Sequence, residues 1–96
     1  MAILVLLEGE VKDGSADALE NILTDIFPGT RSYDGCGGIT AAFDAERKNV
    51  VFVEYWESQS HYEQYLAWRR ETGVLGEILA QFESEPSIRY FDRSGA

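Results

Sequence analysis

The chain has 96 residues, 45% of them hydrophobic and 12% aromatic, which is enough for one packed core and too little for two, so we expect a single domain over residues 1–96. Its 17 acidic and 8 basic residues give a net charge of −9. The electric field of a protein with this charge repels nucleic acids and anionic membranes. The lone cysteine, Cys36, excludes an internal disulfide and suits a reducing cytoplasm, and no Cys or His spacing is typical of a metal site.

Residues 2–11 predict the first strand, with apolar side chains on both of its faces. One face carries Ile3, Val5, Leu7 and Val11, and the other carries Leu4 and Leu6. The apolar run has no basic leader and is far shorter than the roughly 20 residues that span a bilayer, so we expect a strand rather than a signal or a membrane span.

The first helix is expected to begin after Ser15, a residue type that caps helix N-termini, with Asp17 in its first turn. Its apolar residues recur at the spacing of an amphipathic helix. They are Leu19, Ile22, Leu23 and Ile26. Pro28 and Gly29 follow, and we expect them to end the helix near Phe27.

Two strands over residues 39–43 and 50–56 come next, and the short polar loop between them favours an antiparallel hairpin. The remaining elements follow in chain order. They are a helix from Ser58 or Ser60 to about Arg70, a short helix within residues 74–82 and a strand over residues 87–91. This order predicts an α+β, ferredoxin-like βαββαβ fold, in which a four-stranded antiparallel sheet carries its helices on one face.

Helices on one face would leave the other face of the sheet uncovered, and that face is also apolar. It would show Leu4 and Leu6 of the first strand, or Val51, Val53 and Tyr55 of the third. An apolar patch larger than a few hundred Å² is rarely left exposed on a monomer. We therefore expect a homodimer in which two sheets pack face to face about a twofold axis.

Three stretches of the chain resemble one family, the antibiotic biosynthesis monooxygenase (ABM) domain of the dimeric α+β barrel proteins. They are TR at residues 30–31 followed by DGC at 34–36, EYWES at 54–58, and the aromatic helix that comes next. The resemblance spans about residues 3–92 and implies a dimeric α+β barrel. It also implies oxygenation without a cofactor, in which an electron-rich aromatic substrate such as an anthrone loses a proton and its anion reacts directly with dioxygen.

By position, Trp56 matches the family's tryptophan that closes the third strand and faces a cavity between helices and sheet. Many members carry a histidine nine residues later, where this chain has Tyr65, and its only histidine, His61, comes four residues earlier than that. Haem-degrading members carry a histidine ligand on this helix and an asparagine in the first strand. The first strand of this chain has no asparagine.

The second helix turns several candidate site residues to one side of a helical wheel. They are Tyr62, Tyr65, Leu66 and Arg69, with Trp68 and His61 on the flank. The tyrosines fit either core packing or a wall that holds a substrate ring. For Arg69 there are two alternatives: it reaches solvent or an acidic partner, or it binds the anion of a substrate.

For each of three further residues the sequence leaves two interpretations open. Trp56 either stacks on a planar ligand or fills the core. Histidine is the side-chain type that titrates near neutral pH, so His61 is the reserve base, although its place in the first turn of the helix also fits a solvent-facing residue. Arg89 on the last strand fits a substrate ligand or an ion pair between chains.

The leading interpretation is a cytoplasmic homodimer that oxygenates a small aromatic or quinone-like molecule with dioxygen and no metal or other cofactor. Trp56 and Tyr65 would hold the ring and Arg69 would stabilise its anion. The alternative is a non-catalytic ligand-binding or structural dimer module, and a haem-degrading enzyme is less favoured. A structure with no enclosed cavity that touches Trp56, and with Arg69 pointing to solvent, would exclude the oxygenase.

Overall fold

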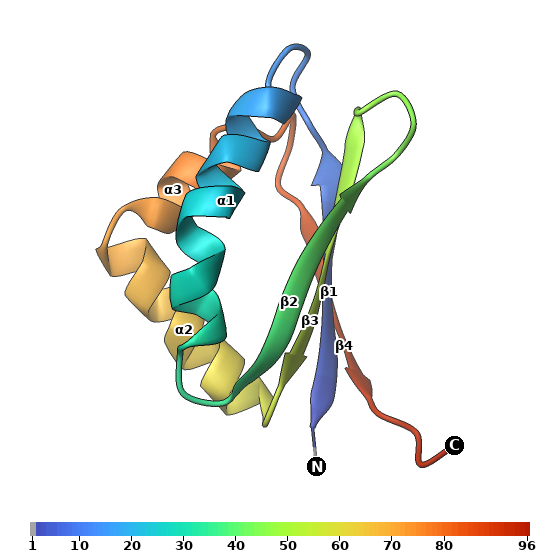
Figure 1. Cartoon of the computed structure of the whole chain (residues 1–96), viewed down its shortest axis with the longest axis vertical. Coiled ribbons are helices and arrows are strands. Elements are labelled where there is room, and N and C mark those ends of the chain that lie inside the picture. Colours follow the sequence, from blue (N-terminus) through green and yellow to red (C-terminus); the bar gives the residue numbers. More distant parts are fainter. Residues whose placement is uncertain (1) are drawn as a thin grey trace.

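The computed structural model describes residues 2–96 and shows a four-stranded sheet with its helices packed on one face (Figure 1). The strands are β1 (Ile3–Glu10), β2 (Cys36–Phe43), β3 (Asn49–Trp56) and β4 (Ser87–Asp92). The helices are α1 (Ala16–Arg31), α2 (Gln59–Glu71) and α3 (Val74–Leu79). Neighbouring strands are antiparallel in the order β2-β3-β1-β4. This confirms the predicted α+β, ferredoxin-like architecture.

The core lies between the helices and the inner face of the sheet, and it has two parts. The larger part is built around Leu7, Leu19 and Phe52, and it extends to Ile78 of α3. The smaller part consists of Val5, Trp56, Tyr62 and Tyr65. Each of β1 and β3 contributes only every second residue to the core, because successive side chains of a strand point to opposite faces of the sheet and one of these faces lies against the helices.

Helix α1 continues to Arg31, so the predicted end near Phe27 is wrong. Pro28 lies inside the helix, and the Ser32 N–H closes the last turn on the Pro28 carbonyl oxygen at 3.2 Å. Thr30, beyond the proline, is fully buried against α2. These tertiary contacts outweigh the local preference of proline to stop a helix.

Helix α2 begins at the predicted cap, since the Ser58 side chain accepts a hydrogen bond from the His61 N–H. Its buried residues are Tyr62, Tyr65 and Arg69, which confirms the inward side predicted from the helical wheel. The chain leaves α2 through Gly73, whose φ of 85° lies in the left-handed region that favours glycine.

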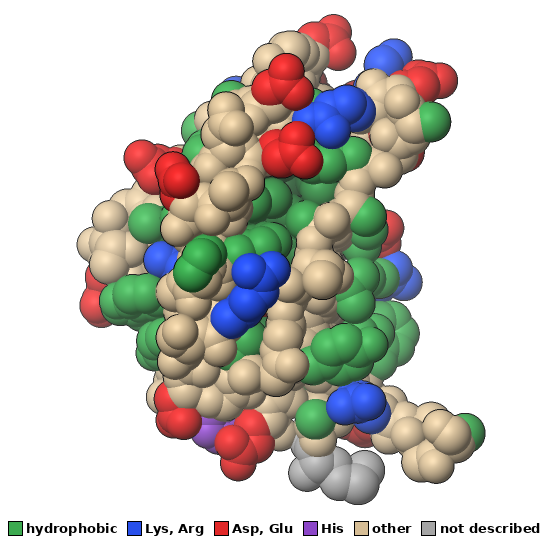
Figure 2. Space-filling view, viewed as in Figure 1, with side chains coloured by type: hydrophobic (Ala, Val, Ile, Leu, Met, Phe, Trp, Pro, Cys, Tyr) green, Lys and Arg blue, Asp and Glu red, His purple; other side chains and the backbone are tan. Residues whose placement is uncertain are grey.

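The outer face of the sheet is covered by no element of residues 2–96 (Figure 1). It is largely apolar, and Figure 2 shows hydrophobic side chains gathered over the strands at the right-hand margin. Its apolar residues include the partly buried Leu4, Leu6, Val51 and Val53 and the exposed Tyr55 and Phe91. No helix in the described part of the chain is long and apolar enough to cross a membrane.

Candidate functional site

The C-terminal end of α2 holds a buried arginine that has no acidic partner. Arg69 is only 6% exposed. Its Nη2 donates to the Ile26 carbonyl oxygen at 2.7 Å and to the Thr30 hydroxyl at 3.1 Å, and its Nε donates to the Tyr65 hydroxyl at 3.1 Å. No ion pair found within residues 2–96 includes it. A buried cation bonded only to neutral groups stabilises an anion that enters beside it.

Tyr65 extends this network toward α1. Its hydroxyl lies 2.6 Å from that of Thr30, whose own proton reaches the Ile26 carbonyl oxygen at 3.4 Å. The Tyr65 hydroxyl can therefore donate to Thr30 while it accepts from Arg69. Burial raises the pKa of Tyr65, and the bonds from Thr30 and Arg69 act in the opposite direction. Near neutral pH, Tyr65 is a neutral phenol.

A carboxyl group lies on the inner face of the sheet. Glu54 of β3 is 2% exposed, and the Trp56 indole Nε1 donates to its Oε1 at 3.0 Å. Burial raises the pKa of Glu54 to about 7, and the Trp56 hydrogen bond opposes this rise. Near neutral pH this carboxyl group is present in both its forms, so it can accept or release a proton.

Glu54 was not predicted as a site residue from the sequence, although it begins the EYWES stretch. The signal that could have found it is the alternation of β3 with period two, because Phe52 and Trp56 share the buried face and Glu54 lies between them. An acidic residue in that phase of a strand must point into the core.

Tyr62 of α2 supplies an unpartnered hydroxyl. The residue is 1% exposed, and its hydroxyl forms no hydrogen bond with any group of residues 2–96. Burial, followed by the charge of Glu54, raises the pKa of Tyr62. An unsatisfied buried hydroxyl costs about 1–3 kcal/mol, so a ligand atom that bonds it would be stabilised there.

These groups meet at a cavity of about 30 Å³ between the helices and the sheet. Its surface is almost wholly apolar, and the residues with polar groups that help to line it, here called the polar wall, are Glu54, Tyr62, Tyr65 and Arg69. The apolar wall consists of Leu7, Ile26, Phe27, Ile39, Phe52, Leu66, Leu75, Ile78 and Leu79. This volume suits about one water molecule, so a ring-sized ligand must displace lining side chains. The wall from α3 is the part that can move at least cost, because that helix has 6 residues and Leu79 is exposed.

Trp56 is absent from the lining of this cavity, although the family resemblance implies that it faces one there. It is fully buried, and its ring packs against Tyr33, Tyr62 and Tyr65 with centroids 6.3, 5.7 and 4.9 Å away. A ligand cannot stack on it unless these tyrosines move. In this geometry Trp56 acts on the cavity through Glu54, whose carboxylate it holds.

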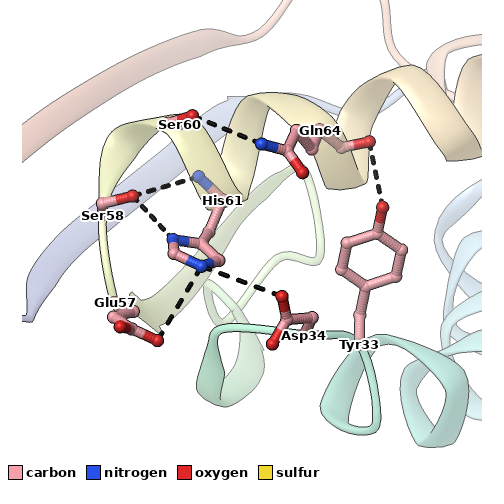
Figure 3. A network of polar contacts seen from close by, with 7 residues as sticks. All are labelled: Tyr33, Asp34, Glu57, Ser58, Ser60, His61 and Gln64. Carbon is pink, nitrogen blue, oxygen red and sulfur yellow. Dashed lines mark hydrogen bonds and ion pairs between the residues drawn. The ribbon is translucent and has the colours of Figure 1, made fainter.

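His61 lies in a separate network at the other end of α2 (Figure 3). Its Nδ1 is 2.7 Å from the Ser58 hydroxyl, and its Nε2 is 3.8 Å from a carboxylate oxygen of both Asp34 and Glu57. The ring also covers Gly35, where a Cβ atom would lie 2.5 Å from it. His61 is absent from the lining of the cavity. Its contacts connect the start of α2 with the end of β3 and with the segment between α1 and β2.

Arg89 is not brought to the cavity either. It pairs with Leu6 in the sheet, whose side chain lies on the outer face, and its Nη2 is 2.6 Å from Glu8 Oε1. Cys36 is partly buried, and burial raises the pKa of its thiol. Within residues 2–96, no group of three or more His, Cys, Asp and Glu side chains could hold a metal ion.

The fold and the cavity together define a class, the ferredoxin-like α+β proteins with a small cavity between helices and sheet. Within this class, the chain belongs to the antibiotic biosynthesis monooxygenase family, whose model matches residues 2–71. The match includes the whole polar wall of the cavity and confirms the resemblance noted in the sequence. A search of curated proteins gave no match.

Solved structures share the fold at low sequence identity. A conserved protein from Methanosarcina mazei Go1 is 16% identical with a TM-score of 0.86, covering 98% of this chain and 94% of its own. Rv0793 from Mycobacterium tuberculosis is 14% identical with a TM-score of 0.84, covering 100% and 98%. A crystal structure described as an antibiotic biosynthesis monooxygenase is 17% identical with a TM-score of 0.83, covering 96% and 98%. These likenesses show the fold.

Proposed function

We propose that the protein is a cytoplasmic, cofactor-independent monooxygenase that acts on a small aromatic or quinone-like substrate. The observation that carries the proposal is Arg69, a buried cation held by neutral groups at the wall of a mostly apolar cavity. Apolar walls suit an aromatic ring, and the guanidinium suits the anion that forms when the ring system loses a proton. Family membership supports the same class of reaction.

The proposed reaction converts a ring CH₂ group, as in an anthrone, into a carbonyl group. The substrate loses a proton to a base, and the resulting anion transfers its electrons to dioxygen and forms a carbon–oxygen bond. Loss of water then leaves the carbonyl, so one oxygen atom enters the product and the other leaves with two hydrogens. Electrostatic stabilisation of the anion is the contribution that a buried arginine makes most directly.

The other site residues predicted from the sequence lie at different distances from the cavity and would have different roles in this reaction. Tyr62 and Tyr65 are the aromatic part of the cavity wall, against which a ring would pack. Trp56 supports them from behind. His61 would reach the substrate only if α2 shifted, and Arg89 would bind it only outside this cavity.

The test is oxygen uptake by the purified protein with a panel of anthrones and hydroquinones. We expect turnover with at least one of them, and a fall of about 100-fold in kcat for Arg69→Lys, which keeps the charge but not the planar, three-way hydrogen bonding. Arg70→Lys is the matched control, because Arg70 is the next residue and is exposed. No uptake with any compound, or equal rates in both variants, would contradict the proposal.

A second candidate is a non-catalytic ligand-binding or structural dimer module, which the small cavity favours. On this alternative the aromatic side of α2 is core, and ligands bind without consuming oxygen. Calorimetric binding of the same panel, measured beside oxygen uptake, separates the two functions. Haem degradation is tested in the same series by titration with haemin, where the absence of a Soret shift removes it.

We also propose that the protein is a homodimer formed through the outer face of the sheet. This face combines Leu4, Leu6 and Val53 with the exposed rings of Tyr55 and Phe91, and such a surface is rarely left in water. Light scattering should give about twice the chain mass of 10.8 kDa, and Val53→Glu should return a monomer. A wild-type mass near one chain at micromolar concentration contradicts the proposal.

A further inference from the structure

Two polar residues that line the cavity each have an atom that could form a further hydrogen bond. One residue lies on the sheet and the other on helix α2. On the sheet side, Trp56 bonds Oε1 of Glu54, and no group of residues 2–96 bonds Oε2. On the helix side, the Tyr62 hydroxyl has no partner. The two groups do not bond each other, yet the charge of Glu54 is close enough to affect Tyr62. Both residues line the same cavity, so a ligand atom that enters there can meet an acceptor and a donor.

The chemistry of this pair selects the ligand atom that fits between them. That atom must give a proton to the carboxylate and accept a hydrogen bond from the tyrosine, and a hydroxyl group does both. A ketone or ether oxygen only accepts, and a carboxylate ligand is repelled by ionised Glu54. The neighbouring apolar walls, among them Leu7, Phe27 and Phe52, favour a hydroxyl carried by a ring.

We propose that Glu54 is the proton acceptor of the site and that Tyr62 bonds the same substrate oxygen, so that the substrates are phenols and enols. This inference rests on the proposed monooxygenase function and names its base and its substrate class. An anthrone meets the requirement through its enol tautomer, which is a phenol.

The proton transfer balances within the cavity. The substrate O–H bond breaks, its electron pair stays on the substrate oxygen, and the proton goes to Oε2 of Glu54. The carboxyl group becomes neutral, which suits its buried place, and the negative charge moves to the substrate. Tyr62 then donates to a charged oxygen rather than a neutral one, which strengthens its bond. Arg69, in the same wall, attracts the anion.

Other titratable or charged groups face Glu54 from the elements packed around it. They are Tyr62, Tyr65 and Arg69 of α2, Tyr90 of β4 and Cys36 of β2. The pKa values of the three tyrosines and of the cysteine are all raised. These groups therefore keep their charge state across neutral pH, and Glu54 is the member of this set that changes. Its pKa of about 7 matches a base that works near neutrality.

His61 is the competing base, and its contacts argue against it. Its Nδ1 is engaged with Ser58, its Nε2 lies beside two carboxylates, and it does not line the cavity.

The first test uses 4-nitrophenol and its methyl ether, 4-nitroanisole, as a matched pair of probes. We expect the full-length protein to bind the phenol about tenfold more tightly, because the ether has no proton to give to Glu54, and Tyr62→Phe to weaken the binding of both probes, because both oxygens accept from the tyrosine. Tyr55→Phe, an exposed tyrosine on the outer face, is the control and should bind both probes as the wild type does. Equal affinity of the wild type for both probes overturns the proposal.

The second test locates the proton. Ionised 4-nitrophenol is yellow, so at about pH 7, where part of Glu54 is ionised and can take a proton, the bound probe should be more ionised than the free probe in the wild type and in Glu63→Gln, but not in Glu54→Gln. Glu63 is an exposed acid on α2. Near-ultraviolet circular dichroism of each variant reports whether the core is intact. A bound probe that is no more ionised than the free one in the wild type overturns the role of Glu54.

Oxygen uptake separates this inference from the function on which it rests. We expect Glu54→Gln to lower kcat by about 100-fold or more and to retain binding, because the amide still accepts a hydrogen bond but takes no proton. If Glu54→Gln turns over like the wild type, the inference fails and the monooxygenase stands. If the wild type consumes no oxygen while both probe results hold, the monooxygenase fails and the phenol site stands.

Discussion

The two ends of α2 carry two of the catalytic residues predicted from the sequence, His61 and Arg69, and these residues lie in opposite surroundings. The side chain of His61, in the first turn, is 28% exposed and is surrounded by a serine and two carboxylates. Arg69, in the last turn, is buried and bonded only to neutral groups. The histidine has a charge partner in reach but is close to water, whereas the arginine is away from water and lacks such a partner.

This difference shows that surroundings, rather than residue type, decide where chemistry is favoured. Charges near water are screened, and exposed ion pairs contribute little. At the buried end an unbalanced cation, an unpartnered hydroxyl and a carboxyl group with a pKa near 7 share one small cavity. His61 belongs to the side-chain type that is the usual proton acceptor near neutral pH, but here it is held by its contacts at the edge of the molecule. Glu54 becomes a proton acceptor in this pH range because burial raises its pKa.

The largest effect that would test this contrast is removal of the buried guanidinium. We expect Arg69→Ala to lower the free energy of unfolding by about 4 kcal/mol, because three acceptors, two of them in buried bonds, lose a charged donor at once. Urea unfolding measures it. Arg70→Ala should stay within about 0.5 kcal/mol of wild type, since that side chain is exposed. Equal losses in the two variants would mean that the buried network contributes nothing specific.

Replacement of the buried carboxyl group should produce a stability difference that depends on pH. The pKa of Glu54 is raised from 4.5 to about 7, so the folded wild type binds its proton more tightly than the unfolded chain and loses stability as pH rises through this window. Glu54→Gln lacks that loss. We expect it to be more stable than wild type by about 3 kcal/mol above pH 7, with the difference vanishing below about pH 4.5.

Urea unfolding at about pH 4 and pH 8 measures this difference, with Glu63→Gln as the exposed control. A gain for Glu54→Gln that is the same at both pH values would show that its carboxyl group is not perturbed by burial.

The sequence predicted the architecture because strand and helix periods are local properties, and it predicted that Arg69 faces inward for the same reason. Pro28 was misread because its local preference was overruled by contacts with α2, which is distant in the chain. The role of Glu54 depends on how tightly neighbouring side chains close around it, and periodicity alone gives a direction but no depth. The size of the cavity, and the exclusion of Trp56 from it, depend on packing in the same way.

At the exposed end of α2, the close contact between His61 and Gly35 offers a smaller effect. Gly35 has a φ of 86°, and a Cβ atom there would lie 2.5 Å from the His61 ring. We expect Gly35→Ala to cost about 2 kcal/mol, from the clash and from left-handed strain. In a His61→Ala background the same change should cost about 1 kcal/mol, because only the strain remains. Thermal unfolding of the four proteins gives this cycle, and an undiminished cost would show that the ring does not rest on the glycine.

The smallest expected effect tests whether the His61 network is structural. Ser58 caps α2 by accepting the His61 N–H at 3.2 Å, and its hydroxyl also lies 2.7 Å from Nδ1. Ser58→Ala should lower the free energy of unfolding by about 1 kcal/mol through loss of the cap. Ser58→Asp, which can still cap the helix, should recover most of this loss. The kcat for oxygen uptake should stay within about twofold of wild type in both variants, because neither Ser58 nor His61 lines the cavity. A large fall in kcat with Ser58→Ala at unchanged stability would instead move the chemistry to the exposed end of α2, since the side chain that this change releases there is the imidazole.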